Sequence, residues 1–419
     1  MELKKKIFIY ILYSTTLYLG LIFSENSSGG AKIDANYLYP FIVKFSEDFN
    51  QGFKLFLDSK SILIHSPVFY ILSGYLLKFF GNLLLLKSFY IFISCFLPLI
   101  FYFILKERNI LNIKNIYLFY LSLIIFYSPY FRGSAIWLLG DNLSLIFFSL
   151  SILFYLKGVN LNSSKYFYLS FFALILCSYI RYYYCIYAIF FLFEYYKYLR
   201  FKNFLILIFL SILFSLPALA YFYFLYFNSE FFSTFGDWSR VNYINSSLQL
   251  FTIIFFYIFI IVIFQLDSFL NYLKFNRNII ISFLIIFLVF YILNYYILNA
   301  SDVLPWRGGG VFVRILKFLG LEQIFFLFII SFISLIFLDF VLSKNRSRNY
   351  LLIFSIITSL SLIIVYQKYL DPLFYILLFG LIDSDAVNNF IKNYSKTFVY
   401  LHIYLISFFI FSLLFYLNI

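Results

Sequence analysis

The sequence predicts an all-α polytopic membrane protein. Of its 419 residues, 64% are hydrophobic, 26% are aromatic and 12% are charged, so most of the chain would be insoluble in water. The apolar residues come in runs near the ~20 residues that a helix needs to cross a bilayer core. The net charge of +13 comes from short basic clusters between those runs, which is typical of membrane topology and not of nucleic-acid binding. We expect a single membrane domain over residues 1–419.

About twelve apolar segments are long enough to be transmembrane helices. They are residues 7–23, 83–105, 113–129, 142–157, 166–180, 182–199, 203–227, 248–266, 278–298, 323–342, 350–366 and 398–417. The first follows Lys4, Lys5 and Lys6 and has no signal-peptidase motif after it, so we expect an uncleaved anchor with a cytoplasmic N-terminus. Alternation from there puts the short basic loops, such as 105–109 and 343–349, in the cytoplasm, as the positive-inside rule requires.

Longer loops are expected on the opposite, extracytoplasmic face, where chemistry usually resides. The first covers residues 24–66, and two late loops cover 299–322 and 367–397. These long loops and the interfacial helices beside them complete the predicted architecture.

Two short apolar stretches, 67–81 and 372–382, each start at a proline, which is favoured at the first position of a helix. We expect both to be helices in the outer membrane interface, with Tyr70, Tyr75 and Tyr375 at headgroup level. The alternative is that a stretch of this kind is a short tilted span, which would reverse the topology of all that follows.

Acids at the outer ends of the spans are candidate functional residues. Asp34 lies in AKIDANYLYP, just after the first apolar run, and Asp141 opens the span that follows it. An acid at a helix N-terminus also has a structural explanation, because its carboxylate caps free backbone N–H groups. Glu47 and Asp48 are further acids in the same loop as Asp34.

Arginines on or near the same face are candidate anion ligands: Arg132, Arg181, Arg240, Arg307 and Arg314. Arg181 has hardly a polar neighbour in CSYIRYYYCIY, and a charge at membrane depth normally has a partner or a task. The segment PWRGGGVFVRI places three glycines between two arginines. Glycine lets a backbone approach a ligand, and arginine binds phosphate with a forked donor group. The alternative is a flexible turn whose arginines contact lipid headgroups.

Together these groups fit sugar transfer from a polyprenyl-phosphate donor, whose tail stays in the bilayer and whose sugar phosphate lies at the interface. A carboxylate can take the proton of an acceptor hydroxyl as it attacks the anomeric carbon, a contribution of about 10²–10⁴-fold. Arginines can stabilise the departing phosphate. The three cysteines and two histidines are scattered, so no zinc site or disulfide framework is expected; a divalent cation stays open as a cofactor.

The chain resembles the GT-C superfamily of polytopic glycosyltransferases. In that superfamily an acid follows the first span, a His/Pro segment and an interfacial helix ending in Phe-Gly lead into the second, and another acid opens the fourth. Here these are Asp34, IHSPVFYILSGYLLKFFGN (64–82) and Asp141. The chain is most similar to the dolichyl-phosphate-glucose α-1,2-glucosyltransferase group, through GDWSRVNYINSSLQLFTIIFFYIF (236–259), PWRGGGVFVRI (305–315) and LDPLFYILLFGL (370–381). Ala35 stands where that pattern usually has a second acid.

The resemblance implies Asp34 as the catalytic base and Asp141 as a residue that positions the acceptor or a metal. It also implies Arg307 and Arg314 as ligands of the donor phosphate. We further expect Arg181, His65, Glu47 and Asp48 to contribute to substrate binding, and either Glu47 or Asp48 could replace Asp34 as the base.

The expected partners are a polyprenyl-phosphate sugar donor, a glycan or lipid acceptor and the lipid bilayer. Richness in Phe, Tyr, Ile, Asn and Lys is what an A+T-rich genome encodes, which favours the inner (cell) membrane of a bacterium. Two other classes stay open: a polysaccharide polymerase of the O-antigen type, and a flippase or other transporter of lipid-linked sugars.

Overall fold

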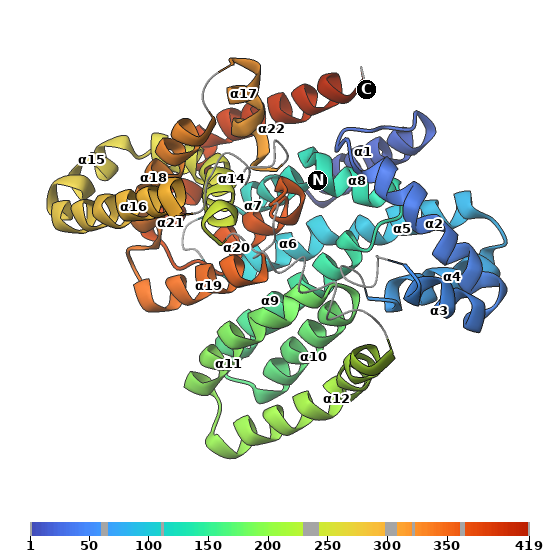
Figure 1. The fold of residues 1–419 in the computed structure, drawn as a ribbon. Helices are drawn as coiled ribbons and strands as arrows, with labels where there is room; N and C mark the ends of the chain where they lie inside the picture. The colour runs from blue at the N-terminus through green and yellow to red at the C-terminus, as the bar shows by residue number, and fades with distance from the viewer. Residues whose placement is uncertain are drawn as a thin grey trace. The chain divides into compact units, whose positions relative to one another are not determined.

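The structure is a computed structural model that describes residues 2–59, 66–109, 113–228, 243–297, 308–320, 323–360 and 365–417. Every regular element in these ranges is a helix (Figure 1), as the sequence predicts. The chain divides into two compact units, Met1–Phe235 with Phe398–Ile419, and Gly236–Thr397. The single membrane domain expected from the sequence stays a prediction, and each unit is described by itself.

The first unit contains the helices up to α12 and most of the last helix, α22. Their bounds are α1 (Glu2–Ile22), α2 (Ala31–Glu47), α3 (Phe49–Leu57), α4 (Val68–Phe80), α5 (Leu83–Ser94), α6 (Phe96–Glu107), α7 (Asn115–Ser122), η2 (Leu123–Tyr127), α8 (Pro129–Ile136), α9 (Asp141–Leu161), α10 (Ser164–Ile180), η3 (Tyr182–Ile186), α11 (Tyr187–Tyr198), α12 (Phe201–Asn228) and α22 (Tyr394–Leu417).

The second unit contains the helices from α14 to α21. Their bounds are α14 (Tyr243–Ile263), α15 (Leu266–Phe275), α16 (Arg277–Ile297), α17 (Gly310–Phe318), α18 (Gln323–Leu342), α19 (Arg346–Ser359), η5 (Gln367–Tyr369), α20 (Leu373–Gly380) and α21 (Asp385–Lys392).

Within the described ranges, seven helices are long and apolar enough to cross a membrane, or up to nine if each of two bent helix pairs counts as one span. This is compatible with a multi-pass membrane protein, but the twelve expected spans are not confirmed. Several expected spans form helices that are too short. Residues 113–129 and 166–180 give apolar helices of fewer than 18 residues, and 350–366 gives α19, with 14 residues.

The expected first outer loop, 24–66, is largely helical where it is described. In α2, Leu38, Phe41, Ile42 and Phe45 are buried, and their i, i+3, i+4, i+7 spacing puts them on one face. Asp48 then caps α3, because its side chain accepts a hydrogen bond from the backbone N–H of Gln51 at 2.7 Å.

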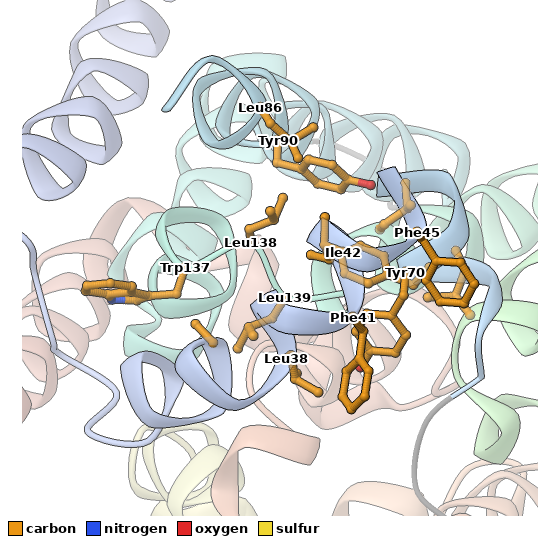
Figure 2. Close-up of a cluster of buried hydrophobic side chains, with 14 of the residues drawn as sticks. Leu38, Phe41, Ile42, Phe45, Tyr70, Leu86, Tyr90, Trp137, Leu138 and Leu139 are labelled. Atoms are coloured by element: carbon orange, nitrogen blue, oxygen red, sulfur yellow. The ribbon is translucent and has the colours of Figure 1, made fainter. Parts of the chain in front are cut away.

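The expected interfacial helix 67–81 is α4, which ends at Gly81 in the left-handed conformation, with φ of 65°. Its tyrosines differ from the expectation, because Tyr70 is only 2% exposed whereas Tyr75 is 54% exposed. Tyr70 faces a core cluster shared by α2, α4, α5 and the α8–α9 turn. Figure 2 shows this cluster, with Phe41 and Ile42 of α2 beside Tyr70. Its hydroxyl is therefore directed into the protein and not towards lipid headgroups.

The expected placement of residues 343–349 and 367–397 on opposite faces is not confirmed. Lys344 Nζ lies 3.3 Å from Asp383 and 3.2 Å from Asp385, and Asn349 Nδ2 donates to the Asp383 carbonyl at 2.8 Å. The chain thus leaves through α19 and returns through α20 to the same end of the second unit.

All eight residues of α20 are buried, Tyr375 among them. The segment 372–382 is therefore enclosed by protein, unlike the expected interfacial helix with Tyr375 at headgroup level.

In the first unit, α22 runs parallel to α1. Tyr127 and Arg132, in the η2–α8 segment, each contact both helices. From Tyr127 to Arg132, the contacted positions move towards the C-terminus on α1 and on α22 alike. The contacts are those of Tyr127 with Tyr13 and His402, and of Arg132 with Thr16 and Phe409. Farther along, the Tyr416 ring lies against Gly29, in the segment that connects α1 to α2. The twelve-span topology requires the first and last spans to be antiparallel, so this part of the expected topology is not confirmed either.

Candidate functional site

The centre of the candidate site is an ion pair between Asp141 and Arg181. Helices α9 and α10 pack against each other along their length (Figure 1), with only residues 162–163 between them. This short connection makes them antiparallel, so the start of α9 meets the end of α10. Arg181, directly after α10, donates from an Nη atom to Asp141 Oδ2 at 2.8 Å. The arginine side chain is 8% exposed and the aspartate side chain 35% exposed.

The α8–α9 turn fixes the position of Asp141. The Ser134 hydroxyl donates to the Leu139 carbonyl at 3.1 Å and accepts from the Asn142 backbone N–H at 3.2 Å. The buried Asn142 amide donates to Ser94 at 3.1 Å and to the Phe131 carbonyl at 2.9 Å. Asn142 thus anchors the first turn of α9, while its neighbour Asp141 is left partly open to solvent.

Asp34 shares the surroundings of this ion pair. It lies in the first turn of α2 and is partly exposed, and α2 packs on α4. Burial raises the pKa of Tyr70 on α4 above its usual value; Arg181 lowers it, and Asp141, Asp34 and Tyr37 raise it further. All three charged groups singled out in this part of the sequence therefore act on one buried hydroxyl.

Arg181 stays charged despite its burial. Desolvation is the largest single effect and lowers its pKa, but Asp141, Tyr70 and Tyr183 together raise the pKa by more, so the net change is upward. A buried guanidinium fixed in this way supplies a permanent positive charge at the site. The partly exposed carboxylates supply proton acceptors, and Tyr70, which the sequence analysis treated as an interfacial anchor, supplies a hydroxyl.

Four other expected site residues lie apart from this cluster or outside the described residues. Glu47 forms an exposed ion pair with Lys44 at 2.6 Å, and Asp48 is the cap of α3. His65 and Arg307 lie outside the described residues. The roles expected for these four residues stay predictions.

Arg314 lies on α17 in the second unit and is partly buried. Before it, Gly308, Gly309 and Gly310 all have positive φ angles. The backbone N–H of Gly309 donates to the Val365 carbonyl at 2.9 Å, and a Cβ on Gly310 would lie 2.8 Å from the Gln367 side chain. The positive φ angles and the close contacts of these glycines with other parts of the protein explain why glycine is needed here, without a bound ligand. The phosphate-binding roles of Arg307 and Arg314 stay predictions.

A second buried arginine of the first unit, Arg132, has a structural role. It forms a two-pronged ion pair with Glu25, through Nε at 2.8 Å and through an Nη atom, and it also bonds Thr16. Glu25 was not singled out in the sequence, since its only signal was an isolated acid after the first apolar run. The pair ties the end of α1 to α8.

No family model, curated protein or solved structure matches this chain. Within the described ranges, no three His, Cys, Asp or Glu side chains gather into a group that could hold a metal ion. The chemistry of the site must therefore be argued from the side chains themselves: a partly exposed acid, an ion-paired acid, a buried arginine and a buried tyrosine.

Proposed function

We propose that this protein is an integral membrane glycosyltransferase that moves a sugar from a polyprenyl-phosphate donor to a glycan or lipid acceptor on the extracytoplasmic side. The observation that carries the proposal is the Asp141–Arg181 ion pair, with Asp34 on α2, the helix that packs against α4 and its buried Tyr70. These residues come from three separate stretches of sequence, and the fold brings a buried positive charge and partly exposed acids into one part of the first unit.

Asp34 is the general base in this proposal. Its carboxylate takes the proton of the acceptor hydroxyl while the hydroxyl oxygen forms a bond to the anomeric carbon. The bond between that carbon and the donor phosphate oxygen breaks, and polyprenyl phosphate leaves with the electron pair. The base is assigned to Asp34 and not to Asp141, because the Asp141 carboxylate is held by Arg181.

Asp141 and Arg181 orient the reactants in this proposal. The ion pair holds the Asp141 carboxylate in one position, and its exposed part can accept a hydrogen bond from a second hydroxyl of the acceptor. The fixed charge of Arg181 favours the negative charge that develops on the leaving phosphate, an effect that is strong where water is excluded.

The test is transfer by the purified protein in lipid nanodiscs, supplied with a panel of polyprenyl-phosphate sugars and with glycan and lipid acceptors. We expect a glycosylated acceptor and free polyprenyl phosphate in equal amounts, without a nucleotide sugar. Extension of a lipid-linked oligosaccharide by whole repeat units would instead indicate a polymerase. Movement of a lipid-linked sugar across the bilayer without a new glycosidic bond would indicate a flippase; either result would overturn the proposal.

A further inference from the structure

Two lysines of the first unit gather on one aromatic ring. The Nζ atom of Lys87, on α5, lies 5.0 Å from the centre of the Trp137 ring and 4.7 Å from that of Tyr39. The Nζ atom of Lys32, on α2, lies 5.7 Å from the centre of the same Trp137 ring. Since α2, α5 and the end of α8 each supply part of this group, the arrangement depends on the fold and is not a local run of basic residues.

The aromatic rings that hold the lysines are themselves fixed. The Tyr39 hydroxyl donates to the Trp137 carbonyl at 3.1 Å, and the Trp137 indole N–H donates to the Glu25 carbonyl at 2.8 Å. The Trp137 side chain is buried. A cation over the face of an indole is attracted by the ring electrons, so the Lys87 ammonium is confined between two rigid walls.

No acid balances these two charges among the residues that the structure describes, where neither lysine forms an ion pair. The acid next to Trp137 in space, Glu25, is already bound by Arg132. Lys87 is also only partly exposed. It lies on α5, which together with α6 forms a segment, Leu83–Glu107, that is long and apolar enough to cross a membrane. An ammonium group is costly in such a helix unless it has a partner or reaches the membrane surface.

We infer that Lys32 and Lys87, held over Trp137 and Tyr39, bind the phosphate group of an anionic lipid. The two ammonium groups supply up to six donors and two positive charges, and the phosphate supplies the negative charge that the described residues lack. Lys87 is close to the start of its helix, and a lipid phosphate lies at the matching depth, where a bilayer meets water. This binding site stands whether or not the protein transfers sugars.

Two kinds of lipid carry this chemistry, a phospholipid headgroup and a polyprenyl phosphate. The experiment measures binding of phosphatidylglycerol, undecaprenyl phosphate and zwitterionic phosphatidylcholine to the detergent-purified full chain by native mass spectrometry. We expect both anionic lipids, or one of them, to bind at least tenfold more tightly than phosphatidylcholine. The anionic lipid that binds more tightly identifies the source of the phosphate.

The variants are Lys87→Gln, Lys32→Gln and the control Lys78→Gln, which removes an exposed lysine of α4 in the same unit. Lys87→Gln should weaken the preferred anionic lipid about tenfold or more, Lys32→Gln several-fold, and Lys78→Gln not at all. If Lys87→Gln does not fold, the exposed Lys32 still provides the test. Equal affinities in the Lys32 and Lys78 variants and the wild type, or no preference for anionic lipids, would overturn the inference. Because a polyprenyl phosphate is also the leaving group of the proposed reaction, it is the loss of affinity in the lysine variants that tests this site separately from the proposed function.

Discussion

The two buried arginines of the first unit are paired with acids whose side chains differ in exposure. Glu25, the partner of Arg132, has a side chain that is 9% exposed, whereas Asp141, the partner of Arg181, is 35% exposed. Arg132 also bonds Thr16 and lies 4.8 Å from the centre of the Phe409 ring, so its donors are used within the protein. The first pair is closed to a substrate, and the second is open on its acidic side.

Glu25→Gln should therefore lower stability and leave chemistry intact. Removing one charge of a buried ion pair typically costs about 3–5 kcal/mol, because Arg132 is left buried without its carboxylate. The free energy of unfolding in detergent should fall by roughly this amount, while transfer per folded molecule stays near the wild-type value. A large loss of transfer in protein that is still folded would show that Arg132 and Glu25 belong to the working site.

Asp141→Asn should lower both stability and transfer. It leaves Arg181 buried without this carboxylate, as Glu25→Gln leaves Arg132, so we expect a loss of about 3 kcal/mol in the free energy of unfolding. Transfer should fall by about 10²-fold, since the acceptor loses an oriented carboxylate. The comparison with Glu25→Gln uses the same two assays, and an Asp141 variant that is less stable but fully active would remove Asp141 from the mechanism.

At the scale of elements, the crossing of α2 and α4 sets the distance between Asp34 and Tyr70. The two helices touch at Gly74, where an added Cβ would lie 2.6 Å from Phe45 Cβ and 3.0 Å from the Phe45 carbonyl carbon. Neither contact can be relieved by rotating a flexible side-chain end. Gly74 therefore allows the close approach of α2 to the helix that carries Tyr70.

Gly74→Ala should push α2 away from α4, costing about 1–3 kcal/mol in overpacking, and lower transfer without changing any residue of the cluster. The matched control is Gly81→Ala at the end of the same helix. Gly81 has a positive φ and no atom within 4 Å of an added Cβ, so this change costs about 1 kcal/mol of backbone strain and moves no helix. Equal transfer by the two folded variants would contradict the role of the α2–α4 crossing.

The sequence predicted some elements of the site and missed others for identifiable reasons. Asp141 and Arg181 were both singled out, but their pairing depends on the antiparallel packing of α9 and α10, which the residues around each of them do not encode. Helix α2 was expected as a loop, although Leu38, Phe41, Ile42 and Phe45 carry a helical period. The burial of Tyr70 depends on α2 covering α4, so it could not be predicted while α2 was expected to be a loop.

Across the entire chain, the lengths of the individual helices were predicted less well than the helical fold class. The apolar composition correctly indicated helices, but the number of spans depends on where each helix ends, and α19 and α20 are shorter than a bilayer requires. Enclosure by protein lets such short apolar segments exist, and composition does not distinguish them from spans. One misassigned segment reverses the expected direction of every later one, and the direction expected for α22 is not confirmed.

The parallel arrangement of α1 and α22 predicts that the two termini lie on opposite faces of the membrane. Reporters fused to each end should be accessible from different sides of sealed vesicles. In a Cys185→Ser background, Lys344→Cys and Asp385→Cys should both react with an impermeant thiol reagent from one side, because these residues lie together in the structure. Labelling of the two cysteines from opposite sides, or both termini on one face, would support the twelve-span topology instead.

The most direct measurement of the central claim is the single-turnover rate of sugar transfer by Asp34→Asn, beside Asp58→Asn as a control. Asp58 is an exposed acid at the end of α3 in the same unit. Asparagine keeps the shape of Asp34 but cannot accept the proton, so the rate should fall by about 10²–10⁴-fold, with donor binding retained and with Asp58→Asn at the wild-type rate. A rate for Asp34→Asn equal to that of the control would contradict the account.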